Sequence, residues 1–131
     1  MRLLDLATEL SAEASLVAAL SAVEQSADTM TVELRDALKP LFASLLIKRL
    51  QCPIIVVTAI EGRAQELAND IKMWSPDITV LHFPDVDQPA YANLAVNGDL
   101  LAQRAGVMGR LTMLEEDELA LVVVSIRSLM R

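Results

Sequence analysis

The stretch Pro53–Thr58 constrains the fold more than any other part of this chain. Four branched apolar side chains, from Ile54 to Val57, follow one another directly after a proline. A run without polar alternation has no solvent side, which is typical of a parallel strand covered on both faces. We therefore predict a central strand here, with helices packed on both of its faces.

An amphipathic helix is predicted directly after this strand. Thr58 and Glu61 have the spacing of a capping box, in which each side chain satisfies a free backbone N–H of the other. Apolar residues then recur on one helical face, at Ile60, Ala64, Leu67, Ala68, Ile71 and Trp74. A strand and helix in this order form half of a βαβ unit, and an unrelated α+β fold is the alternative.

Further helices and strands alternate along the rest of the chain. Residues 1–28 are predicted as an N-terminal helical segment, with the helix running from about residue 3 to residue 27. The patterns predict strands over 29–34, 78–83 and 119–125, and helices over about 40–51, 98–114 and 126–131. For the first of these strands, a helix from Thr31 is the alternative, and Ser125 is predicted to cap the last helix. Residues 29–131 are thus expected to form one α/β domain with a parallel sheet.

Composition narrows the classes of protein. The chain has 131 residues, enough for one domain, and 53% of them are hydrophobic, yet no apolar run approaches the roughly 20 residues of a membrane span. We expect the excess apolar surface to be covered by another domain or subunit. The last strand lies close to the end of the sequence, which suggests a fragment of a larger protein.

Charge and cysteine content add two expectations. The formal net charge of −7 disfavours binding to a nucleic-acid backbone by this chain alone, because phosphate contacts need clustered Lys and Arg. The single cysteine, Cys52, fits a reducing cytoplasm and is expected to be a small core residue rather than a nucleophile.

Arg35, Asp36 and Lys39 occupy the place of a phosphate-binding loop, before the helix at Pro40. A working loop needs glycines, so that several N–H groups can surround a phosphate, and then Lys and Ser or Thr. Here the glycines and the Ser or Thr are missing, Pro40 lacks an N–H and Asp36 repels phosphate. We therefore expect no nucleotide binding, with Lys39 as an ordinary surface residue.

No other catalytic or metal-binding pattern is predicted. The last strand ends in Val124-Ser125, without the paired acids that hold magnesium in nucleotide hydrolases. His82 has no acidic or thiol partner at a recognisable spacing and is expected to be structural. The acidic run Glu115–Glu118 is expected to be a solvated loop, since four consecutive carboxylates cannot converge on one ion.

Four stretches of the chain carry a family resemblance when they are taken together. The first is Pro53–Thr58 with the helix residues Arg63, Ala64, Leu67, Asp70 and Ile71; the others are Phe83–Tyr91, Leu101–Arg104 and Val122–Met130. They resemble the N-terminal region of the bacterial transcription-repair coupling factor, and the phrase from Phe83 to Tyr91 is the most specific part. The resemblance covers roughly residues 29–131.

The resemblance implies a fold similar to domain 1a of the excision-repair helicase UvrB, a P-loop-NTPase-like (RecA-like) fold in degenerate form. Arg35–Lys39 would be a decayed phosphate loop, and this part would need no cofactor. The complete protein would use ATP and magnesium to translocate on duplex DNA, remove stalled RNA polymerase and recruit UvrA in the cytoplasm. This part would be a scaffold that contacts other domains of the same chain.

Two other functions remain open from the sequence. One is an atypical nucleotide-binding domain, which tight ATP binding abolished by Lys39→Ala would support. The other is a stand-alone α/β interaction module that dimerises through its apolar surface, which a stable homodimer would support.

Overall fold

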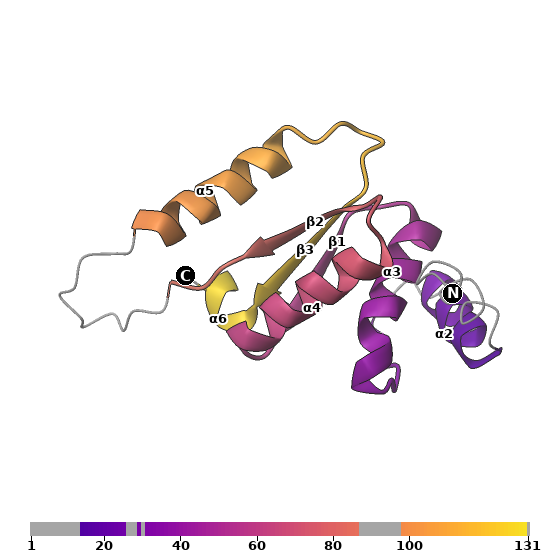
Figure 1. The fold of residues 1–131 in the computed structure, drawn as a ribbon. Coiled ribbons are helices and arrows are strands. Elements are labelled where there is room, and N and C mark those ends of the chain that lie inside the picture. The colour runs from indigo at the N-terminus through magenta and orange to yellow at the C-terminus, as the bar shows by residue number, and fades with distance from the viewer. Residues whose placement is uncertain (1–13, 26–28, 30, 87–97, 131) are drawn as a thin grey trace.

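The computed structural model describes residues 14–25, 29, 31–86 and 98–130. Helices and strands alternate along most of this part of the chain (Figure 1). In order, the elements are α2 (Ala14–Gln25), the 3-10 turn η1 (Asp36–Leu38), α3 (Lys39–Leu50), β1 (Ile54–Thr58), α4 (Glu61–Trp74), β2 (Thr79–Phe83), α5 (Gly98–Thr112), β3 (Ala120–Ser125) and α6 (Ile126–Leu129).

The three strands form one parallel sheet in the order β1-β3-β2. Ile54 of β1 lies opposite Leu121 of β3, and Val80 of β2 lies opposite the same leucine on the other side. The predicted α/β class with a parallel sheet is therefore confirmed. The central strand is β3, however, and not Pro53–Thr58, whose strand β1 lies at one edge of the sheet.

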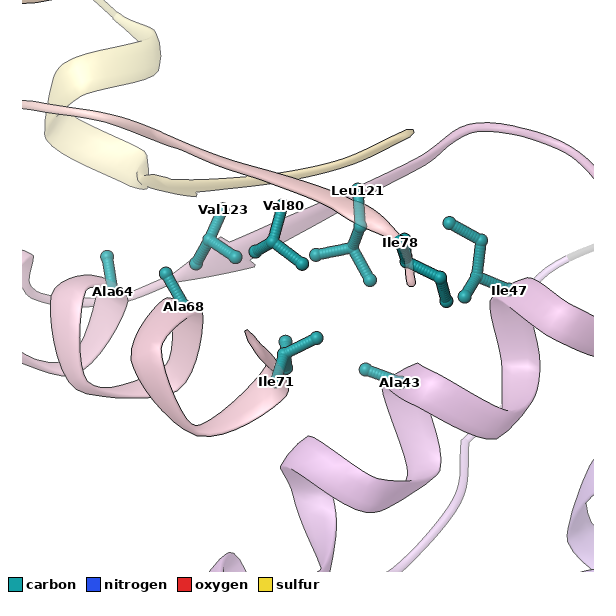
Figure 2. Close-up of a cluster of buried hydrophobic side chains, with 9 residues drawn as sticks. All are labelled: Ala43, Ile47, Ala64, Ala68, Ile71, Ile78, Val80, Leu121 and Val123. Carbon is teal, nitrogen blue, oxygen red and sulfur yellow. The ribbon is translucent and has the colours of Figure 1, made fainter. Parts of the chain in front are cut away.

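The hydrophobic core lies between one face of the sheet and the helices α3 and α4 (Figure 2). Ile47, Ile71, Leu121 and Val123 have no exposed surface. The core also contains Ala43, Ala64, Ala68, Ile78 and Val80. Small alanines on α4 let this helix approach the sheet closely, and branched residues on β3 suit a strand that is buried on both sides.

The opposite face of β1 is open, which corrects the prediction that helices cover both of its faces. Successive strand residues point to opposite faces, so Ile54 and Val56 pack against the core while Ile55 and Val57 point away from it. The side chains of Ile55 and Val57 are 65% and 47% exposed. Helix α5 lies on this side of the sheet (Figure 1) but buries none of its own residues.

Two other predictions for the N-terminal half are wrong. Residues 31–34 form no strand, although Val32 and Leu34 are more buried than Thr31 and Glu33. Their alternation gives them one less exposed side, but no backbone hydrogen bond joins them to β1, and a strand needs such a partner. Cys52 is exposed and not in the core, because it lies in the connection before β1.

The ends of the helices were predicted in part. Ser125 caps α6 as expected, since its Oγ accepts a hydrogen bond of 3.2 Å from the Ser128 N–H. The capping box at α4 does not form: Thr58 Oγ1 donates to the Ile60 carbonyl, and no side chain caps this helix. Of the helix predicted over 3–27, residues 14–25 are α2, and the remainder lies outside the described residues.

We expect Ile71→Ala to lower the free energy of unfolding by about 2–5 kcal/mol, because it leaves a cavity in the core beneath β3. Met73→Ala on the same helix is the matched control, since Met73 is 61% exposed and its loss should change stability by no more than about 0.5 kcal/mol. Urea denaturation followed by circular dichroism measures both. Equal effects of the two substitutions would contradict this core.

Candidate functional site

The predicted phosphate loop lies beside the carboxyl end of β1. Asp36 and Lys39 line a hollow of about 430 Å³ together with residues 56–59, Arg63 and Leu67. Ligands of open parallel sheets bind at the carboxyl ends of the strands. Asp36 and Lys39 therefore lie at the carboxyl edge of the sheet, although the strand expected before them does not form.

Two backbone amides of this loop are occupied by hydrogen bonds within the loop. The Leu38 N–H donates to the Arg35 carbonyl over 2.9 Å, and the Lys39 N–H donates to the Asp36 carbonyl. Pro40 has no N–H. Positions 38–40 therefore present no free amide, whereas a phosphate-binding loop needs several consecutive ones.

The charges of the loop are also paired. Lys39 Nζ lies 2.6 Å from Asp36 Oδ1, and both side chains are exposed. The hydrogen bond from Lys39, its positive charge and the more distant charge of Arg63 hold the pKa of Asp36 below the ordinary 3.8. Arg63 itself forms an ion pair of 3.0 Å with Glu66. Each of these cations in the hollow thus has a carboxylate beside it.

A second polar cluster lies at the carboxyl ends of all three strands. His82 Nε2, on β2, is 2.7 Å from Glu61 Oε1, at the start of α4, although the two groups are not aligned for a hydrogen bond. Asp85 follows β2, and its Oδ2 is 3.3 Å from Arg127 Nε. Glu61, Asp85 and Arg127 line a hollow of about 210 Å³.

Sequence reasoning missed this cluster. His82 was expected to be a structural residue without an acidic partner at a recognisable spacing, and Glu61 reaches it from α4, the helix that follows the opposite edge strand β1. Parallel strands bring residues distant in sequence to one edge of the sheet, so the spacing of the residues gives no signal for this pair. A strand order with β3 in the centre of the sheet could have indicated the contact between Glu61 and His82.

Arg104 fastens α5 to the rest of the domain. Its guanidinium carbon lies 4.2 Å from the centre of the Phe83 ring, which is a cation–π distance. It also donates hydrogen bonds to the Pro84 carbonyl over 3.1 Å and to Ser128 Oγ over 3.2 Å. These contacts hold α5 near the end of β2 and the start of α6.

An apolar cleft of about 300 Å³ remains between α5 and the sheet. Phe83, Val122 and Val124 line it from the sheet, and Met108 and Leu111 line it from α5. We call the cleft and the exposed residues around it the open apolar face, which comprises Ile55, Val57, Phe83, Met108, Leu111, Val122, Val124 and Leu129. It has the composition of a protein contact surface.

Comparisons with known proteins add no functional assignment. The chain matches no protein-family model, no curated protein and no solved structure. Among the described residues, no group of three or more His, Cys, Asp or Glu side chains could hold a metal ion. No helix in the described ranges is long and apolar enough to cross a membrane. Functional inference therefore rests on the geometry of the chain itself.

We expect Lys39→Met to raise the pKa of Asp36 towards 3.8, because the substitution removes the hydrogen bond and the nearest positive charge. A carboxyl whose folded pKa is lowered stabilises the protein above its unfolded pKa, and this contribution is lost as the pH falls through the folded value. An NMR titration of the side-chain carboxyl carbons measures the pKa in both proteins. The same low pKa in the variant would contradict the pairing.

Proposed function

We propose that this chain is a non-catalytic scaffold portion of a bacterial transcription-repair coupling factor. The observation that carries the proposal is the loop beside β1, which lies where a phosphate would bind but has no free amide at positions 38–40. Its lysine is held by Asp36. These features suit a helicase-like domain that has lost nucleotide binding and retained its structural role.

The positions of the family-like stretches support the proposal. Phe83 and Pro84, Arg104, and Ser128 come from three of the stretches that resemble the coupling factor, and they meet in one set of contacts. Ser128 Oγ also donates to the Pro84 carbonyl over 3.0 Å. Three of the four resembling stretches thus contribute residues that hold α5 and α6 against the sheet, which suits a structural framework.

The open apolar face supports a scaffold role in a second way. Large apolar side chains such as Ile55, Met108 and Leu129 are 65%, 54% and 56% exposed. Exposed apolar clusters of this kind mark contacts with other protein surfaces. In the proposed protein, a neighbouring domain of the same chain would cover this face and would take its orientation from the sheet.

The activity of the complete protein is part of the same proposal. Other domains would bind duplex DNA, hydrolyse ATP with magnesium, displace stalled RNA polymerase and recruit UvrA. The part described here would bind none of these and would keep the neighbouring domains in place.

Strand-specific repair tests the proposal. Deleting the gene in its native cell should abolish the faster removal of ultraviolet lesions from the transcribed strand of an active gene. Because Lys39 is paired with Asp36 and positions 38–40 offer no free amide, a copy with Lys39→Ala should restore this bias as fully as the wild-type copy. Lesion-specific cleavage of each strand, followed by quantitative hybridisation, measures both results.

Two results would contradict the proposal. An unchanged strand bias after deletion would remove the link to transcription-coupled repair. Restoration by the wild-type copy but not by Lys39→Ala, at equal protein levels, would favour a working nucleotide site at this loop.

A further inference from the structure

The outer edge of β1 has no strand beside it among the described residues. β1 pairs with β3 along its inner edge only, from Ile54 opposite Leu121 to Thr58 opposite Ser125. In the part of the chain that the structure describes, no backbone hydrogen bond joins its outer edge to another segment. Alternate residues of a strand direct their N–H and C=O groups to the same edge. β1 therefore presents a row of backbone donors and acceptors that another strand can pair with.

Open space lies along this outer edge. Val56 and Val57 are successive strand residues and point to opposite faces of the sheet, yet both line the hollow of about 430 Å³ at the carboxyl end of β1. A hollow that touches both faces of a strand lies at its side, and β3 fills the inner side. Val56, which faces the core, is also only half-buried, whereas Val123 opposite it on β3 is fully buried. The outer edge is thus accessible to another segment.

The side chains of β1 do not protect this edge against pairing. Edge strands are usually blocked by charged residues or proline, or by covering elements. The strand Ile54–Thr58 contains neither a charged residue nor a proline, and its Ile55 and Val57 are exposed. The other edge strand, β2, differs, since all of its residues are at least half-buried and its His82 lies beside Glu61. β1 is therefore the edge that favours pairing.

We propose that the outer edge of β1 binds an extended segment of a partner protein as a fourth strand of the sheet. Main-chain hydrogen bonds would supply affinity, and side chains at alternate positions would supply selectivity. β3 shows which side chains suit this strand, because the residues opposite Ile54–Thr58 are Leu121, three valines and Ser125. The partner segment is therefore an uncharged strand rich in branched apolar residues. Its side chains would pack beside Ile55 and Val57.

A partner segment fits this edge better than a second copy of the chain does. Each copy carries a formal net charge of −7, so two copies repel each other when their edges approach. A single uncharged strand meets no such repulsion. It binds at the side of β1 and leaves the open apolar face accessible to a neighbouring domain. The inference rests on the sheet alone and does not depend on the proposed role in repair.

A peptide with the sequence of β3, Ala120–Ser125, flanked by two lysines at each end, is the probe. In a titration followed by backbone amide signals in NMR spectra, we expect saturable shifts at residues 54–58, with a dissociation constant on the order of millimolar. The β1 amides that do not bond to β3 should also exchange their hydrogens more slowly. The same peptide with its four central amides N-methylated keeps its charge and side chains but loses those donors. It should bind at least about tenfold more weakly.

Variants separate pairing at this edge from other apolar contacts. Val57→Lys places a charge beside the added strand and should weaken binding of the peptide at least about tenfold. Met73→Lys is the matched control with the same change of charge, because Met73 is exposed on α4, and its affinity should stay within about twofold of the wild type. Unchanged amide dispersion shows that each variant is folded. If Val57→Lys is not folded, Ile55→Lys decides.

The proposal is overturned if the wild-type chain shows no saturable shifts at residues 54–58, or if the shifts are confined to residues 79–83 of β2. Equal binding of the N-methylated peptide would show that no strand forms. Unchanged binding in a folded Val57→Lys or Ile55→Lys variant would place the peptide elsewhere. Shifts at residues 54–58 that grow with protein concentration, without peptide, would assign the edge to a second copy of the chain instead.

Discussion

The parallel pairing of β3 with both β1 and β2 is the interaction on which the rest of the structure depends. It brings three segments that are distant in sequence to a common edge, with Thr58 beside Ser125 and Phe83 beside Val124. It also directs the side chains of all three strands alternately to two faces. One face joins α3 and α4 in the core, and the other carries the open apolar face.

The sequence predicted the elements that depend on local pattern. Apolar runs indicated β1 and β3, and apolar residues at helical spacing indicated α4, because buried positions carry apolar side chains. The cap of Ser125 on α6 was also found, since it involves residues only three positions apart. Residues close in sequence were thus sufficient to predict these elements.

The failures have a common physical reason, which is that they depend on contacts between distant residues. The run Ile54–Val57 looks buried on both sides, but β1 lies at the edge of the sheet and one of its faces is open. Thr58 and Glu61 have capping-box spacing, but no capping box forms. The Glu61 carboxylate instead lies beside His82, which belongs to β2 and not to the strand of Thr58. The cluster at the carboxyl edge was missed for the same reason, whereas Lys39 and Asp36 were considered together because they are close in sequence.

We expect another protein surface to cover the open apolar face, and photo-cross-linking in the native cell can detect that contact. A photoreactive amino acid would replace Ile55, which is 65% exposed on this face, and in a matched control Met73, which is 61% exposed on α4. We predict that position 55 cross-links to a protein segment outside residues 14–130, in the same gene product or in a partner, and that position 73 does not. Failure of position 55 to cross-link, or equal yields at both positions, would contradict it.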